Sequence, residues 1–230
     1  MAAHAQAEGL LLIDKPAGIT SHDVVQLARR VYGERSIGHL GTLDPFATGL
    51  LILLLGRSTR LATFIGTEPK VYEATVRFGA ETDTDDCTGQ VIREAPVPSL
   101  SKITEAIGGL TGRFEQLPPA YSAKSIGGTR AYDAARKGEP LTLSPVEVNV
   151  SEWTIRAARD NEIDVAIECG TGTYIRSLAR DLGRTAGSAA HLVSLRRTQS
   201  GLFHVNDAAT VEQLTASPPR LKQLRIVAVQ

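Results

Sequence analysis

Three stretches of strict alternation between apolar and polar residues limit the fold of this chain more than any other feature. Residues 71–79, 146–150 and 163–169 each carry apolar side chains at every second position. In the first stretch these side chains are Tyr72, Ala74, Val76 and Phe78. Successive side chains of a strand point to opposite faces, so the alternation predicts half-buried strands of the kind found in antiparallel sheets.

Other segments predict buried strands and helices. Apolar runs predict strands at residues 9–14 and 50–55, and periodic segments predict helices at residues 20–33, 101–110 and 174–183. Thr20 and Asp23 have the spacing of a capping box, and Gly33 is a suitable C-terminal stop. We therefore predict a mixed α/β (α+β) fold, with a largely antiparallel central sheet and flanking helices.

Residues 114–140 show no clear period. Two pairs, Pro118-Pro119 and Gly127-Gly128, interrupt this segment, which is rich in Tyr, Lys and Arg. We predict an insertion here, with one short helix at residues 131–137. A length of 230 residues suits one large domain, and no repeat or low-complexity linker divides the chain, so we expect a single domain over residues 1–230.

The formal net charge is zero, but the charges are unevenly distributed. Residues 170–200 contain five arginines and one acid, whereas residues 81–86 contain four acids and no base. Helical periodicity places Arg176, Arg180 and Arg184 opposite the apolar side of their helix. Such segregation produces either a cationic face or an ordinary solvated surface.

The sequence lacks the motifs of the common cofactor and metal enzymes. Complete phosphate-loop, dinucleotide, hydrolase and metalloprotease motifs are absent, and Cys87 and Cys169 form no CxxC pair. The longest apolar run, residues 50–55, has six residues, whereas a membrane span needs roughly 20. We expect a soluble, cytoplasmic protein without cofactor, metal or membrane segment.

One acid stands apart in its surroundings. Asp44 is the one acid in the segment GHLGTLDPFATG, Gly38 to Gly49, and no salt-bridge partner lies close to it in the sequence. The following Pro45 biases the Asp44 backbone towards extended conformations. Taken alone, an Asp before Pro in a glycine-rich loop predicts a turn residue.

The same loop resembles the signature loop of the TruB-type tRNA pseudouridine synthases, which convert the uridine at tRNA position 55 to pseudouridine. Five further blocks resemble that family, in its order and at its spacing. They are GLLLIDKPAGITSHDVV, VYEATVRFGAETDTDD, PPAYSAKSIGGTRAYDAARKG, CGTGTYIRSLARDLG and HLVSLRRTQSGLF. The resemblance covers residues 9–203 and implies the pseudouridine synthase fold and activity.

The resemblance implies three catalytic residues. It implies that Asp44 is the essential aspartate, that Arg176 pairs with it, and that Tyr72 stacks on the target base and helps in proton handling. Taken singly, Tyr72 on an apolar strand face predicts core packing, and Arg176 predicts a surface position on a charged helix face.

The resemblance also implies three substrate-binding residues. It implies that His39 enters the RNA loop beside the extruded nucleotide, and that Tyr174 and Leu195 line the uridine pocket. The ordinary structural explanations are a loop histidine or a hydrogen-bonded core histidine for His39, a contact at the helix start for Tyr174 and core packing for Leu195.

The resemblance further implies how RNA is held. Residues 114–140 resemble a thumb-like insertion that closes over the T-arm of tRNA, and the arginines of residues 170–200 would contact phosphates. Too few residues follow Phe203 for the PUA-type RNA-binding module that family members commonly carry, so we expect that module to be absent. We expect a monomer that needs no protein partner.

The chemistry of the reaction agrees with these assignments. Pseudouridine formation needs an ionised carboxylate near C1′ or C2′ of the ribose, as nucleophile or as base, and the sequence leaves both routes open. A partner such as Arg176 keeps that acid ionised in a pocket, while Gly41 and Gly49 permit close approach of the RNA backbone. Two other functions remain open: a non-catalytic RNA-binding or RNA-remodelling protein with this fold, and a pseudouridine synthase for another RNA.

Overall fold

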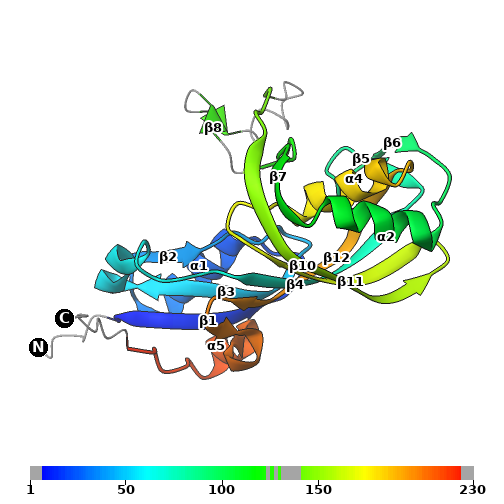
Figure 1. The fold of residues 1–230 in the computed structure, drawn as a ribbon. Helices are drawn as coiled ribbons and strands as arrows, with labels where there is room; N and C mark the ends of the chain where they lie inside the picture. The colour runs from blue at the N-terminus through cyan, green and yellow to red at the C-terminus, as the bar shows by residue number, and fades with distance from the viewer. Residues whose placement is uncertain (1–6, 123–124, 127–128, 131–140, 224–230) are drawn as a thin grey trace, which may run out of the picture. The chain divides into compact units, whose positions relative to one another are not determined.

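The computed structural model of the protein describes residues 7–122, 125–126, 129–130 and 141–223. The chain divides into two compact units. The first unit contains Met1–Lys70 and Arg196–Gln230, and the second contains Val71–Leu195. The chain passes between the units inside strands β4 (Lys70–Phe78) and β12 (Ala190–Ser200) (Figure 1).

A mixed sheet forms the centre of the first unit. Besides the end of β12, its strands are β1 (Gly9–Lys15), β2 (Ile37–Leu40), β3 (Thr48–Leu55), β13 (Phe203–His204) and β14 (Ala209–Thr210). Strand β3 pairs antiparallel with β1 and β2, and parallel with β12 at Arg196 and Arg197. Strand β14 runs parallel to β1, and β13 runs antiparallel to β12.

The core of the first unit is aliphatic. Its central cluster consists of Leu10, Leu12, Leu50, Ile52 and Leu54. Every residue of β3 from Gly49 to Leu55 is buried, because both faces of this strand are covered. A strand covered on both faces has a continuous apolar sequence instead of an alternating one, which explains the run at residues 50–55.

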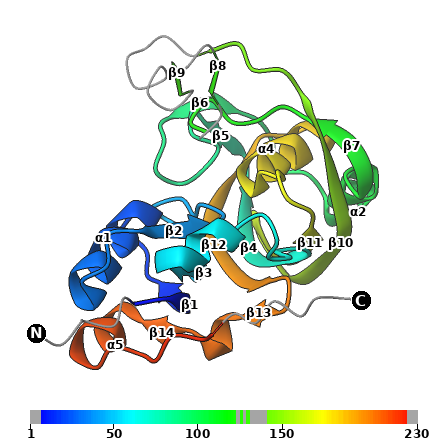
Figure 2. The same ribbon diagram turned by 90° about the vertical axis from the view of Figure 1, so that its left-hand side faces the viewer.

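The helices of the first unit begin at side-chain caps. Helix α1 (Ser21–Tyr32) starts at the predicted capping box of Thr20 and Asp23, and it ends at Gly33, which has a left-handed φ of 62°. Helix α5 (Val211–Ala216) also starts at a capping box. Two short 3-10 helices are η1 (Gly56–Leu61) and η2 (Val205–Asp207). Figure 2 shows β14 and α5 beside β1.

The second unit contains a sheet of five strands in the order β12-β4-β11-β10-β7. The bounds of the remaining strands are Gly112–Gln116 for β7, Val146–Arg159 for β10 and Glu162–Cys169 for β11. Strand β10 pairs antiparallel with both β7 and β11. On β4 the alternating side chains Tyr72, Ala74, Val76 and Phe78 are all buried, as the sequence predicts.

Within the described residues, two helices and two hairpins also belong to the second unit. Helix α2 (Leu100–Gly109) packs beside α4 (Ile175–Thr185), as Figures 1 and 2 show. One hairpin joins β5 (Ala80–Thr82) to β6 (Val91–Glu94). The other joins β8 (Ser125–Ile126) to β9 (Thr129–Arg130), inside the predicted insertion.

The structure confirms the predicted mixed, largely antiparallel α/β fold. All the strands and helices predicted outside residues 114–140 and the C-terminal end are present. Strands β2, β7 and β12 were not predicted. The predicted helix at residues 131–137 lies outside the described residues, as does most of the predicted final strand; within the described part, Lys222 forms an isolated bridge with Leu10.

Both cysteines are free thiols, with Cys87 exposed and Cys169 buried. In the part of the chain that the structure describes, no helix is long and apolar enough to cross a membrane. Among the same residues, no group of three or more His, Cys, Asp or Glu side chains is arranged to hold a metal ion.

Candidate active site

The six predicted site residues come from both units. The first unit supplies His39 on β2 and Asp44 in the loop between β2 and β3. The second unit supplies the other four, Tyr72, Tyr174, Arg176 and Leu195.

Hydrogen bonds from the N-terminal segment hold the loop that carries Asp44. The backbone N–H of Leu43 donates to Ser21 Oγ at 2.9 Å, and Ser21 Oγ donates to the carbonyl of Leu43 at 3.0 Å. Gly18 N donates to the carbonyl of Pro45 at 2.8 Å. The residues on both sides of Asp44 are therefore tied to the chain around the start of α1.

Lys15, the last residue of β1, braces the same loop. It is fully buried, and its Nζ donates to three carbonyls, those of Ile19 (2.7 Å), Pro16 (2.9 Å) and Pro45 (3.4 Å). Burial lowers the pKa of Lys15 to about 8, while the negative charges of Asp44 and Asp23 act to raise it. Lys15 therefore supplies both hydrogen bonds and a positive charge to the surroundings of Asp44.

Arg197 of β12 holds the two ends of the loop region. Its side chain is buried, and it donates from Nε to Leu50 O at 2.8 Å and from Nη2 to Gly41 O at 3.0 Å. A Cβ added at Gly49 would overlap the carbonyl oxygen of Arg197 and lie 2.8 Å from its backbone nitrogen. The predicted role of Gly49 in admitting an RNA backbone is therefore wrong, because its open side is filled by β12.

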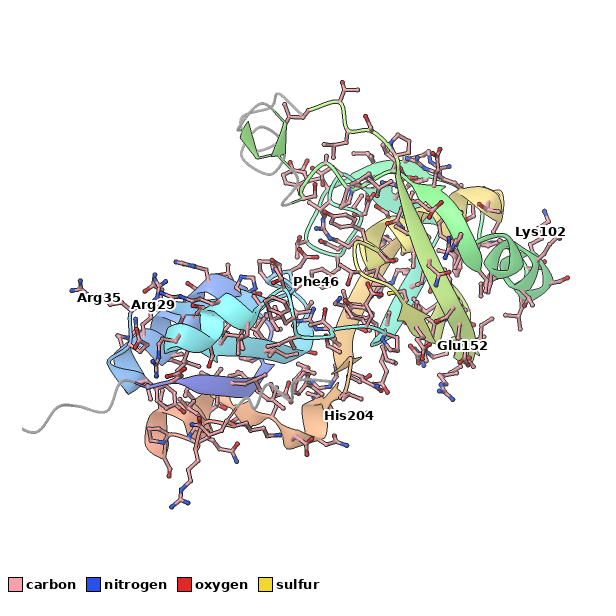
Figure 3. All side chains as sticks on the ribbon, turned by 60° about the vertical axis from the view of Figure 1, so that its left-hand side comes forward. Arg29, Arg35, Phe46, Lys102, Glu152 and His204 are labelled. Atoms are coloured by element: carbon pink, nitrogen blue, oxygen red, sulfur yellow. The ribbon has the colours of Figure 1, made fainter. Side chains whose placement is uncertain are left out.

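Asp44 itself is half-buried at the start of a turn. Its carbonyl accepts a hydrogen bond from Ala47 N at 3.1 Å, so residues 44–47 form a turn, as the Asp-Pro sequence suggests. Figure 3 labels Phe46, the half-buried aromatic side chain of this turn. The turn interpretation and the catalytic interpretation of Asp44 are thus compatible, since the turn hydrogen bond uses its backbone carbonyl.

His39 is a half-buried residue of strand β2, not the loop histidine that the sequence suggests. Burial lowers its pKa, and the positive charges of Arg197 and His22 lower it further. Its Nδ1 is buried and has no hydrogen-bond partner within the described residues. The imidazole is therefore uncharged at neutral pH and offers a flat, largely apolar ring.

Arg176 is buried in the second unit, with only 4% of its surface exposed. It donates from Nη1 to Thr84 O at 3.0 Å and from Nη2 to Tyr121 O at 2.8 Å, and its Nε lies 3.8 Å from Asp86 Oδ2. A planar guanidinium held by several acceptors has one orientation. The surface position that periodicity predicts for Arg176 is wrong.

The other three residues of the second unit are also partly or fully buried. Tyr72 lies on the buried face of β4, and Leu195 is buried on β12. Tyr174 is half-buried at the N-cap position of α4, and both of its backbone polar groups bond to the side chain of Gln116. Their burial fits core packing as well as a pocket, as expected for Tyr72 and Leu195 taken singly.

The predicted cationic side of α4 is largely wrong, because Arg176 and Arg180 are buried and only Arg184 of the three is exposed. Arg180 is buried, and its Nη1 donates to Asp85 Oδ2 at 2.9 Å. Arg184 forms an ion pair with Glu81, to which its Nε donates at 3.0 Å. The acidic run at residues 81–86 therefore pairs with the α4 arginines, of which Arg176 and Arg180 are buried and Arg184 is exposed.

Asp85 and Glu81 both face α4, but their pKa values are shifted in opposite directions from the usual values. Burial raises the pKa of Asp85 to about 6, against the opposing charge of Arg180. Burial alone would also raise the pKa of Glu81, but hydrogen bonds from Arg184 and Arg93 lower it below its usual value.

The arginines of β12 are engaged within the first unit as well. Arg196 forms an ion pair with Asp14 at 2.7 Å, and Arg197 donates to two carbonyls. Each of the five arginines of residues 170–200 is thus bonded within the protein. The expected phosphate contacts from this segment are not supported, because its charges are already paired or buried.

Sequence reasoning missed two residues that support the site, Lys15 and Gln116. For Lys15 the sequence contains a usable signal, because this lysine directly follows the apolar strand of residues 9–14. A lysine in such a position is buried only where hydrogen-bond acceptors surround its ammonium group. For Gln116 no local signal existed, because its partner Tyr174 lies 58 positions further along the chain.

Two family models match the chain. The TruB family pseudouridylate synthase (N terminal domain) matches residues 29–175. The tRNA pseudouridylate synthase B C-terminal domain matches residues 176–223. The first model alone spans more than half of the chain.

Relatives and solved structures agree with these matches. The tRNA pseudouridine synthase B of Thermobifida fusca (strain YX) is 45% identical over 220 residues, which cover 91% of this chain and 75% of the relative. That of Leifsonia xyli subsp. xyli (strain CTCB07) is 48% identical over 223 residues, which cover 92% and 74%.

Among solved structures, a chain of a Cbf5-Nop10-Gar1 complex matches with a TM-score of 0.69 and 26% identity, over 90% of this chain and 53% of that one. An H/ACA RNP bound to a substrate RNA containing 2′-deoxyuridine matches with a TM-score of 0.67 and 25% identity. This chain spans about half the length of the solved chains it matches. From the family models and the relatives, we conclude that the chain belongs to the TruB family of pseudouridylate synthases.

Proposed function

We propose that this protein isomerises uridine to pseudouridine in tRNA, at position 55 of the T-loop. Family membership and the name tRNA pseudouridine synthase B of the relatives support this activity. The observation that carries it furthest is the placement of Asp44 on a loop braced by Lys15 and Ser21, because catalysis needs a carboxylate held in a fixed position.

In the proposed reaction Asp44 acts at the ribose. The N1–C1′ bond breaks, the base turns, C5 joins C1′, the C5 proton passes to solvent and N1 takes up a proton from solvent. Asp44 either attacks C1′ as a nucleophile or removes the C2′ proton as a base. Uridine and pseudouridine are isomers, so the atoms balance without any co-substrate.

Arg176 and Tyr72 complete the proposed catalytic group. Arg176 pairs with Asp44 and keeps it ionised, and Tyr72 stacks on the target base. The contacts of Arg176 with Thr84, Tyr121 and Asp86 support this role, because they aim a buried cation in one direction.

His39, Tyr174 and Leu195 form the proposed substrate-binding group. Extruding a base from a stacked loop costs a few kcal/mol, and stacking on an aromatic side chain recovers about 1–3 kcal/mol. The uncharged ring of His39 fits the space left by the flipped nucleotide, and Tyr174 and Leu195 line the pocket.

The remaining expectations also belong to this proposal. The two units act together as one catalytic domain in a cytoplasmic monomer that needs no protein partner. The insertion at residues 114–140 closes over the T-arm, and catalysis requires no PUA-type module.

The test is tritium release from T-arm RNA labelled at uridine C5, with wild type, Asp44→Asn and Asp44→Ala. We expect release by wild type and none by either variant, with RNA affinity unchanged. Asp44→Asn is the closer comparison, because it keeps the shape of the side chain and removes only the charge. Mapping pseudouridine in the product RNA then checks position 55.

No release by wild type, despite salt-sensitive RNA binding, would overturn the proposal for this substrate. That result would favour a pseudouridine synthase for another RNA or a non-catalytic RNA-binding protein, and tritium release from other labelled RNAs would separate the two.

A further inference from the structure

Gln116, the last residue of β7, is a fully buried side chain that bonds to a single residue. Its Oε1 accepts from Tyr174 N at 2.8 Å, and its Nε2 donates to Tyr174 O at 3.1 Å. Because one partner is a donor and the other an acceptor, only one orientation of the amide satisfies both bonds.

Tyr174 occupies a position that needs such support. It is the N-cap of α4, with φ −96° and ψ 110°, and its side chain makes no capping hydrogen bond. The first N–H groups of a helix have no partner within the helix. Gln116 bonds to the peptide groups on both sides of the Tyr174 Cα, so it fixes the two dihedral angles that determine where α4 begins and where the tyrosine ring points.

The segment after Gln116 continues the attachment to α4. The carbonyl of Leu117 accepts from Ser177 Oγ at 2.9 Å and from Arg180 Nη2 at 2.8 Å. The carbonyl of Tyr121 accepts from Arg176 Nη2 at 2.8 Å. These later contacts attach the body of α4, whereas Gln116 bonds to the residue at its start.

We propose that Gln116 is a positioning residue for pseudouridine formation, which acts through Tyr174 and Arg176; this inference rests on the proposed function. Arg176 follows Tyr174 by two residues within the first turn of α4, so a change at the helix start moves both side chains together. An apolar side chain of similar size would fill the same space, but it would leave the Tyr174 N–H without its partner.

Two substitutions of Gln116 test the proposal by steady-state tritium release. Gln116→Leu keeps the approximate volume and removes both hydrogen bonds, and we expect kcat to fall at least about tenfold with KM changed less than about threefold. Gln116→Glu retains the acceptor for Tyr174 N, but it can donate to Tyr174 O only when protonated. We expect its kcat, divided by that of wild type, to rise as the pH falls from about 8 to about 5.5.

The matched control is Glu147→Gln, at an exposed residue of β10 opposite Glu115, which we expect to have wild-type kcat and KM. Amide hydrogen exchange gives a readout independent of activity, because Gln116→Leu should speed exchange at the Tyr174 N–H, whose hydrogen bond it removes, more than at the amides of Ile175–Thr185. Thermal unfolding tests whether Gln116→Leu folds. If this variant does not fold, the pH dependence of the kcat of Gln116→Glu, divided by that of wild type, decides whether the inference holds.

Two results would overturn the inference: wild-type kcat in a folded Gln116→Leu, or a Gln116→Glu ratio that stays constant with pH. Both results require a wild type that releases tritium, so either one overturns this inference and leaves the proposed function intact. A wild type that releases no tritium from any tRNA substrate would instead overturn the proposed function, and this inference with it.

Discussion

Asp85 and Arg180 form a buried ion pair, with 2.9 Å between Oδ2 and Nη1. They lie 95 positions apart in the sequence. The backbone of Asp85 has a left-handed φ of 61°, and its carbonyl accepts a hydrogen bond from Leu192 N at 3.1 Å. A backbone held in this conformation aims the carboxylate at α4, whereas a flexible loop would leave the carboxylate in solvent.

The burial of Asp85 predicts a pH dependence of stability. Burial raises the pKa of Asp85 to about 6, from 3.8 for the unperturbed group. The folded state therefore holds this proton more tightly, and the stability that the proton contributes is present below about pH 4 and lost as the pH rises through about 6. Over that interval the free energy of unfolding of wild type, relative to Asp85→Asn, should fall by about 3 kcal/mol. Urea denaturation of both proteins at a series of pH values measures this change. A difference in the free energy of unfolding that stays constant with pH would contradict the raised pKa of Asp85.

The bracing of the Asp44 loop by Lys15 predicts a large effect of removing its ammonium. Lys15→Met leaves three carbonyls without their Nζ donor, so the free energy of unfolding should fall by about 2–4 kcal/mol. Lys222→Met, at an exposed lysine of the same unit, should change it by less than about 0.5 kcal/mol. Equal effects of the two substitutions in guanidinium denaturation would show that the buried contacts of Lys15 contribute little.

Close packing of β3 on β12 predicts that Gly49 tolerates no side chain. Its φ is +101°, and an added Cβ would overlap the backbone of Arg197. Gly49→Ala should therefore cost more than about 3 kcal/mol, from backbone strain and displacement of β12 together. Gly38→Ala is the control, because nothing lies within 4 Å of its added Cβ. Thermal unfolding compares them, and similar melting temperatures would refute the packing argument.

Exposed arginines of the first unit are better candidates for phosphate contacts than those of α4. Arg35 is exposed just before β2, the strand that carries His39, and Figure 3 shows it on the same side as Arg29. Arg35→Glu should weaken tRNA binding and reduce the slope of log K against log salt by about 1, with kcat unchanged. Arg156→Glu, at an exposed arginine of β10, should leave the slope unchanged. Filter binding over a range of salt concentrations tests both; an unchanged slope for Arg35→Glu would rule out this contact.

Local patterns were sufficient for most of the fold. The sequence predicts the alternation in β4, β10 and β11 and the capping box of α1, because each of these patterns depends on residues close together in the chain. Strand β12 was missed for a physical reason. It buries the polar residues His191 and Arg197 among apolar ones, which hides the period of two that identifies a strand.

The sequence by itself determined which acid is the candidate for catalysis and to which family the chain belongs, because the Asp44 loop and the other blocks are contiguous motifs. Tertiary structure alone decided the partners of the charged residues. It paired the arginines of the supposed cationic face of α4 with acids of residues 81–86, and it brought Gln116 to Tyr174. Those contacts join residues tens of positions apart, and their buried charges are stable only because folding brings the opposite charges together, which no local spacing encodes.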